Sequence, residues 1–122
     1  MIDITGTTIT MTRGDTLIVT VEILDEQGQA YTPAEGDVVR FALKSAKMKL
    51  GRTDYADPEP LVSKTIPIDT LVLQLNPADT ASLQFGDYRY DIELTHASGV
   101  VDTFINNAFF VIAPEVATPE VD

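Results

Sequence analysis

The single histidine of the chain, His96, is the first residue whose type could do chemistry, because an imidazole beside a hydroxyl and a carboxylate can act as a general base. Ser98 and Asp102 follow it closely in the sequence. The chain has no cysteine, which excludes a thiol nucleophile, a thiolate metal site and a disulfide. Residues 95–99 read "THASG", the composition of a tight turn, and no activated nucleophile can be named beside the histidine. We therefore predict a polar turn residue at position 96, no catalytic residue and no enzymatic activity.

Carboxylates are the second group that could do chemistry, since calcium is held by several converging oxygen ligands. Two sets are close in sequence: Asp54, Asp57 and Glu59 in one loop, and Asp87 with Asp91 along one extended segment. The loop lacks the ligand spacing and the fixed glycine of a calcium loop. Arg89 separates the acids of the second set, which indicates a surface ion cluster. The sequence therefore predicts no metal site and no cofactor, and no glycine loop that would cradle phosphate is present.

Basic residues are distributed unevenly along the chain. The whole sequence has 8 lysines and arginines against 19 acids, and most of the bases fall between positions 40 and 52. They lie on the polar side of one expected strand and in the long loop after it. Loops of this length in a small domain usually have a function. A basic segment on an acidic body suits head-to-tail contact between identical copies. We predict these residues as the protein–protein contacts: Arg40, Lys44, Lys47, Lys49 and Arg52.

The charge and hydropathy of the chain exclude several classes of partner. A formal net charge of -11 opposes binding to nucleic acid, because phosphate backbones attract clustered lysine and arginine. No stretch approaches the roughly 20 apolar residues that span a bilayer, so membrane insertion is not expected. The first ten residues, "MIDITGTTIT", do not have the pattern of a secretory signal peptide. A length of 122 residues fits one domain.

Apolar and polar residues alternate along most of the sequence, which is typical of half-buried β-strands. Pro67 cannot donate a ladder hydrogen bond, so its strand is expected at a sheet edge or ends there. Asn106 and Asn107 interrupt the last apolar run and indicate a bulge, which leaves seven or eight strands. Gly-Asp occurs three times, including in the tripeptide Arg13-Gly14-Asp15, and each time precedes a strand, which favours turn chemistry over an adhesion motif. The alternation covers residues 7–12, 16–24, 37–45, 61–68, 70–75, 87–95, 100–105 and 108–112.

One helical turn is expected near residues 77–83, with Asn76 as its N-cap. Gly86 and then Tyr88 follow, and this order resembles the tyrosine corner of immunoglobulin-like sandwiches, in which the tyrosine hydroxyl bonds to upstream backbone. We predict that role for Tyr88 and a buried position for Tyr90. The predicted fold is an all-β, antiparallel immunoglobulin-like β-sandwich of seven to eight strands. It covers residues 1–112, and residues 113–122 are expected to form a flexible, acidic, proline-containing tail.

Four stretches carry a resemblance to a known family: "TGTTITMTRGDTLIVTVEI", "GDVVRFALKS", "LNPADTASLQFGDYRYDIELT" and "GVVDTFINNAFFVI". Together they resemble phage and prophage tail structural proteins, and are most similar to the N-terminal immunoglobulin-like domain of upper baseplate proteins of long-tailed phages. The resemblance implies a structural or docking role in the virion tail or baseplate, assembly in the bacterial host cytoplasm and no catalytic residues.

The function expected from these features is non-enzymatic assembly or docking through protein–protein contacts. The expected partners are further copies of the chain, in a homo-oligomer, or other tail and baseplate proteins. The alternative is a recognition module that binds carbohydrate or another host receptor, a common use of sandwich domains. Sugar sites usually need exposed aromatic side chains, and the chain has no tryptophan. Under this alternative, the candidate ligand contacts are Tyr55 with Asp54 and Asp57.

Overall fold

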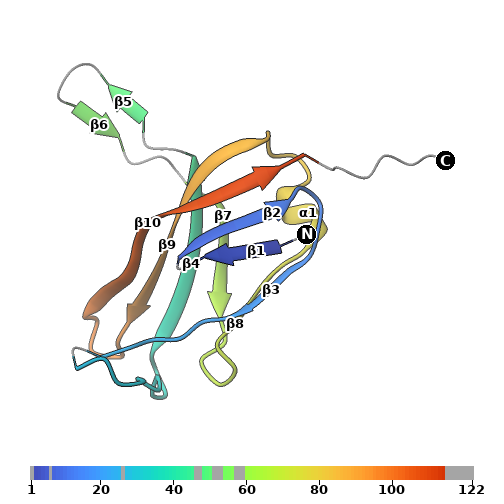
Figure 1. Ribbon diagram of the computed structural model, residues 1–122. Helices are drawn as coiled ribbons and strands as arrows, with labels where there is room; N and C mark the ends of the chain where they lie inside the picture. Colours follow the sequence, from blue (N-terminus) through green and yellow to red (C-terminus); the bar gives the residue numbers. More distant parts are fainter. Residues whose placement is uncertain are drawn as a thin grey trace.

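The computed structural model describes residues 2–5, 7–25, 27–45, 48–50, 54–56 and 60–114. Within these ranges the chain is all-β, as predicted, with one short helix (Figure 1). None of its helices there has the length and apolarity needed to cross a membrane. The elements are β1 (Ile2–Thr5), β2 (Thr8–Thr12), β3 (Leu17–Thr20), β4 (Val38–Ser45), β5 (Met48–Leu50), β6 (Asp54–Ala56), β7 (Pro60–Ile66), β8 (Val72–Leu75), α1 (Pro77–Thr80), β9 (Gly86–Thr95) and β10 (Val101–Ala113).

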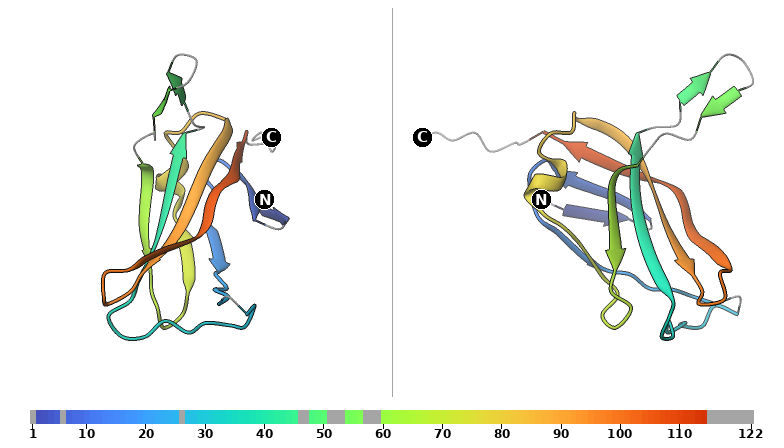
Figure 2. Two further views of the ribbon diagram at one scale, coloured as in Figure 1. Left: turned by 90° about the vertical axis from the view of Figure 1, so that its left-hand side faces the viewer. Right: turned by 180° about the vertical axis from the view of Figure 1, so that it is seen from behind.

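The main sheet has six strands in the order β1-β2-β10-β9-β4-β7. Most neighbours are antiparallel, but β2 and β10 run parallel, with Ile9 aligned to Phe110. The prediction of a purely antiparallel arrangement is therefore wrong for this pair, and the sheet is mixed and curled (Figure 2). Alternation within a strand reports which face is buried and carries no information on the direction of the neighbouring strand.

A second, two-stranded sheet pairs β3 with β8. Its inward side chains Leu17, Leu73 and Leu75 belong to the same hydrophobic cluster as the inward side chains of the main sheet. At the centre of the core, the ring of Phe41 lies 5.6 Å from that of Tyr90 and 6.3 Å from that of Phe110. Burying each large apolar side chain stabilises the fold by about 1.5–3 kcal/mol. One shared core therefore holds the two sheets together.

Strand β10 forms one bent strand across the two asparagines. Its register with β9 shifts between Thr103 and Ile105 and again between Ile105 and Ala108. Asn107 has a positive φ of 56°, and its amide donates to the Asp91 carboxylate at 2.6 Å. The predicted bulge is confirmed, and the two predicted segments are one strand.

The expected strand at residues 16–24 is regular only as far as Thr20. Its partner β8 begins at Val72, directly after Leu71, which has a positive φ of 55°. The pairing continues for a single hydrogen bond, from the Val21 amide to the Leu71 carbonyl at 2.7 Å. The strand ends there because its partner turns away.

Strand β7 confirms the prediction made from Pro67. It ends at Ile66 and lies at the edge of the six-stranded sheet. Strands β1, β5 and β6 were not predicted, because segments of three or four residues are too short to show alternation.

Helix α1 begins where the sequence predicts it. The Asn76 amide donates to the Asp79 carboxylate at 2.7 Å, and Lys64 of β7 lies 3.0 Å from the same carboxylate. Burial works to raise the pKa of Asp79, but the Asn76 hydrogen bond and the Lys64 ammonium bring it below its ordinary value. The buried Thr80 hydroxyl accepts the Gly14 amide at 3.0 Å. The Arg-Gly-Asp segment is thus tied to the helix. It is a turn, as predicted, since the Asp15 amide donates to the Thr12 carbonyl at 3.1 Å and Gly14 has a positive φ of 84°.

The two tyrosines of β9 point into the core and anchor separate segments. The Tyr88 hydroxyl donates to the Gln84 carbonyl at 2.6 Å, which is the upstream backbone bond expected of a tyrosine corner. The Tyr90 hydroxyl donates to the Thr7 carbonyl, and burial raises the pKa of Tyr90. Gly86 has a positive φ of 140°, so glycine suits the step from the helical turn into the strand.

We predict that Tyr88→Phe lowers the free energy of unfolding by about 1–2 kcal/mol, because the Gln84 carbonyl loses its donor while the ring stays buried. Urea unfolding measures this change. The denaturant slope should be unchanged, since the surface exposed on unfolding is the same. An unaltered unfolding midpoint would show that the hydroxyl contributes nothing.

Candidate functional site

The predicted basic contacts separate into two groups in the structure. Arg40 is exposed on β4, between Glu93 of β9 and Thr65 of β7. Lys44 lies on the same strand, and its ammonium is 2.7 Å from the Asp91 carboxylate. The charge of Lys44 is therefore balanced within the domain, which weakens it as a contact for a partner.

The other three predicted contacts belong to the segment after β4. Lys49 is the middle residue of β5, whereas Lys47 and Arg52 lie outside the described residues. Strand β5 pairs with β6, and this register aligns Lys49 with Tyr55 and Leu50 with Asp54. We call this β5–β6 hairpin the arm.

The arm also carries the residues of the alternative prediction. Tyr55 and Asp54 lie on β6, and Asp57 lies outside the described residues. The structure thus brings the basic candidate Lys49 and the ligand candidate Tyr55 side by side on one hairpin. The two predictions therefore fall on the same hairpin.

The arm stands apart from the sheets. Among the described strands, β5 and β6 form a separate two-stranded sheet that pairs with no other strand. The arm projects beyond the end of β4 and the start of β7, at the top of Figure 1, and the views in Figure 2 agree. An isolated two-stranded hairpin is only marginally stable in water. The arm therefore gains most from a partner that covers it.

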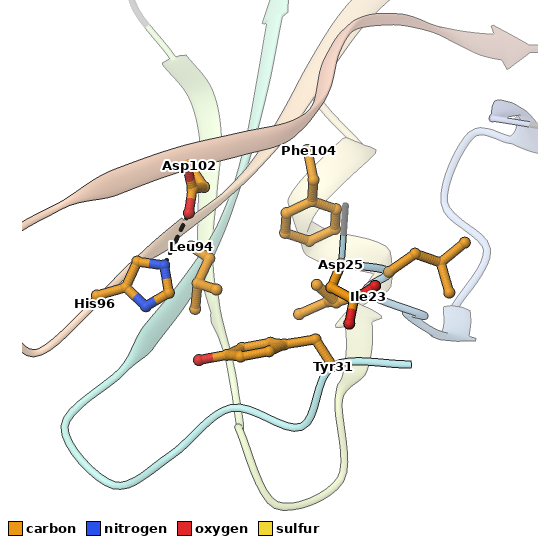
Figure 3. Close-up of a pocket in the computed structure, with 8 residues that line it drawn as sticks. Ile23, Asp25, Tyr31, Leu94, His96, Asp102 and Phe104 are labelled. Carbon is orange, nitrogen blue, oxygen red and sulfur yellow. Dashed lines mark hydrogen bonds and ion pairs between the residues drawn. The ribbon is translucent and has the colours of Figure 1, made fainter. Parts of the chain in front are cut away.

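At the opposite end of the domain, His96 lies between two carboxylates. Its Nε2 is 2.8 Å from the Asp102 carboxylate, and its Nδ1 is 3.9 Å from that of Asp37 (Figure 3 shows the Asp102 contact). The Tyr31 ring meets the imidazole edge to face, with ring centres 6.1 Å apart. His96 also begins the predicted turn, because its amide donates to the Val100 carbonyl at 2.7 Å.

Asp37 is the buried centre of this cluster. Its carboxylate accepts the Ala34 amide and the Tyr31 hydroxyl, both at 2.9 Å, and the Ala97 amide at 3.2 Å. The Ala34 hydrogen bond is the main cause that lowers the pKa of Asp37, against the opposing effect of burial. The hydrogen bond to Asp37 raises the pKa of Tyr31. These bonds fix the loop before β4 against the β9–β10 hairpin.

A hollow of about 310 Å³ opens beside His96. Figure 3 shows the rings of Tyr31 and Phe104 on two sides of it, with His96 and Asp102 at one end. The hollow has an apolar interior, and two carboxylates and an imidazole lie on its walls. Such a site suits a binding partner with an apolar part and a positive charge. The lining residues are Ile23, Leu24, Asp25, Tyr31, Leu94, His96, Asp102 and Phe104.

The sequence did not predict this hollow. In the sequence, Asp37 belongs to one of the Gly-Asp pairs that indicate turns. The hydrogen bond that joins it to the hairpin, from the Ala97 amide, links segments far apart in the sequence. The one available signal was the proximity of Asp102 to His96, which the structure brings to hydrogen-bonding distance.

No protein-family model, curated protein or solved structure matches this chain. In the ranges that the structure covers, no group of three or more histidine, aspartate or glutamate side chains is arranged to hold a metal ion.

We predict that Asp37→Asn lowers the free energy of unfolding at pH 7 and that its effect fades in acid. The folded-state pKa of Asp37 lies below the unfolded value of about 3.9, so its stabilisation is present above that pH. It is lost as the pH falls through the folded-state pKa. Urea unfolding of both proteins between pH 7 and pH 2.5 measures the difference. A difference that stays constant over this range would contradict the assignment.

We predict that Gly36→Ala destabilises the fold more than Gly28→Ala does. Both glycines have positive φ, 95° at Gly36 and 81° at Gly28. Alanine in this left-handed conformation lowers the free energy of unfolding by about 1–2 kcal/mol at either position. A Cβ at position 36 would also lie 2.9 Å from the Ala97 Cβ, whereas one at position 28 has no atom within 4 Å. This clash adds about 1–3 kcal/mol, measured as a lower urea midpoint. Equal midpoints would show that the loop and hairpin are not in close contact.

Proposed function

We propose that the chain is a non-enzymatic module that assembles through protein–protein contacts, as a tail or baseplate component of a phage or prophage virion built in the bacterial host cytoplasm. The sequence resemblance supplies the virion setting. The arm supplies the physical basis for the assembly role.

The proposal includes an immunoglobulin-like sandwich as the framework. The strand order supports this framework: we assign β10-β9-β4-β7 to strands G-F-C-C′ of a variable-type domain, and the β3–β8 pair to strands B and E. The bond from the Tyr88 hydroxyl to Gln84 supports the same assignment. In this framework the arm is an insertion in the connection between strands C and C′.

The observation that carries the proposal is the unpartnered arm. Its two strands have three residues each and pair only with each other among the described strands. A hairpin that pairs with no other described strand has open strand edges, and a partner can extend it by backbone hydrogen bonds. In a monomer, a hairpin of this size would gain little stability by projecting from the sheet.

Charge favours a second copy of the chain as the partner. The segment 46–52, "AKMKLGR", contains three bases and no acid, while the chain as a whole has a net charge of -11. A basic segment that meets the acidic body of another copy gains attraction that depends on ionic strength. Because the two surfaces differ, such a contact is heterologous.

We predict that the protein self-associates at low salt and dissociates towards the 13.3 kDa chain as salt rises to about 1 M, where the Debye length is about 3 Å. The triple variant Lys47→Glu, Lys49→Glu, Arg52→Glu should be monomeric at both salt concentrations. Light-scattering mass on a sizing column measures both effects, and electron microscopy of the same samples shows the assembly.

The matched control keeps the charge and changes the side chains: Lys47→Arg, Lys49→Arg and Arg52→Lys. It should assemble like the parent protein. A protein that is monomeric at every concentration and ionic strength contradicts the proposal. Saturable glycan binding that Tyr55→Ala abolishes would favour the recognition alternative, since Tyr55 lies beside Lys49 on the arm.

A further inference from the structure

We infer that the hollow beside His96 is the acceptor for the arm of a second copy, so that the chain assembles head to tail. This inference rests on the proposed self-assembly and names the surface that receives the arm. Its occupant is strand β5 of the second copy, with the bases that flank it.

The arm and the hollow lie at opposite ends of the same strands. Strand β4 starts with Val38 aligned to Thr95, next to His96, and finishes with Ser45 aligned to Tyr88, where the arm leaves. Eight extended residues separate these ends by about 24 Å. Figure 1 shows the arm at the top and the β9–β10 hairpin at the bottom. An arm therefore cannot reach the hollow of its own chain without leaving this position.

The chemistry of the two surfaces is complementary. In the sequence, bases alternate with apolar residues along β5 and just before it: Lys47, Met48, Lys49 and Leu50. The hollow offers apolar walls and acids, among which the Asp102 side chain is 64% exposed. A lysine can bury its aliphatic stem against apolar walls while its ammonium reaches a carboxylate at the rim. The same arrangement repels an acidic segment.

An exposed apolar residue marks the hollow as a contact surface. Leu24 lies in the lining and is 51% exposed, and Val100 at the tip of the β9–β10 hairpin is 57% exposed. Apolar side chains at the centre with charges around them are the usual anatomy of a protein interface. Burial by the arm would remove this apolar surface from water.

The geometry sets the symmetry of the assembly. Arm and hollow are different patches on one molecule, so each copy has one donor and one acceptor end. Such contacts propagate into filaments, or close into rings when the rotation between copies permits. A pairing of arm with arm would instead be two-fold symmetric and would stop at a dimer.

The test is complementation between two defective chains. The donor-defective variant is the arm triple Lys47→Glu, Lys49→Glu, Arg52→Glu, which keeps the hollow. The acceptor-defective variant is Leu24→Lys with Asp102→Lys, which keeps the arm; both residues are exposed, so the core is unchanged. Each variant alone should be monomeric at low salt. An equimolar mixture should give a one-to-one dimer of twice 13.3 kDa and nothing larger.

The matched control for the acceptor variant is Ile18→Lys with Asp69→Lys. It makes the same substitutions at exposed positions outside the hollow and changes the net charge equally. It should assemble like the parent protein, and circular dichroism should show all the variants folded. Dissociation by this control would mean that net charge, and not the hollow, governs assembly.

The outcomes separate this inference from the proposed function. If the arm triple abolishes assembly while Leu24→Lys with Asp102→Lys does not, the arm docks elsewhere and only the acceptor assignment is overturned. If both variants are monomeric and their mixture stays monomeric, the contact is not head to tail. If the parent chain never associates, the proposed function fails together with this inference.

Discussion

The apolar contact between the six-stranded sheet and the β3–β8 pair is the interaction on which the rest of the structure depends. Phe41, Tyr90 and Phe110 meet at its centre and come from three neighbouring strands. Close packing in a protein interior leaves little freedom for the strands that supply these rings. The long strands β4, β9 and β10 therefore act as a rigid frame whose two ends keep a fixed separation.

Polar contacts at the two ends of this frame differ in what they fix. At one end, Tyr88 secures the step from helix α1 into β9, and β4 leads out into the arm. At the other end, Asp37 collects three hydrogen bonds and holds the loop before β4 against the hairpin. A well-supported hollow and a weakly supported hairpin at opposite ends are the physical basis on which we propose contact between copies.

Local sequence signals predicted the features that depend on neighbouring residues. Asn107 at the bulge, Pro67 at the end of β7 and Asn76 before α1 each act through their own backbone. The parallel pairing of β2 with β10 and the bond between Asp37 and Ala97 join distant segments, and no local pattern reports such contacts. Charge clustering identified the basic segment, but it could not show that Lys44 is paired with Asp91 on another strand.

Hydrogen–deuterium exchange of the intact chain, compared at low salt and at about 1 M salt, tests the proposed contact between copies most directly. At low salt, slower exchange is expected in β5 and β6 and, at the same time, in residues 23–25 and 101–104. Both regions should exchange faster at high salt than at low salt, whereas the protection of β4 and β9 should be the same in both conditions. Arm exchange that is the same at the two salt concentrations would contradict a role for the arm in assembly.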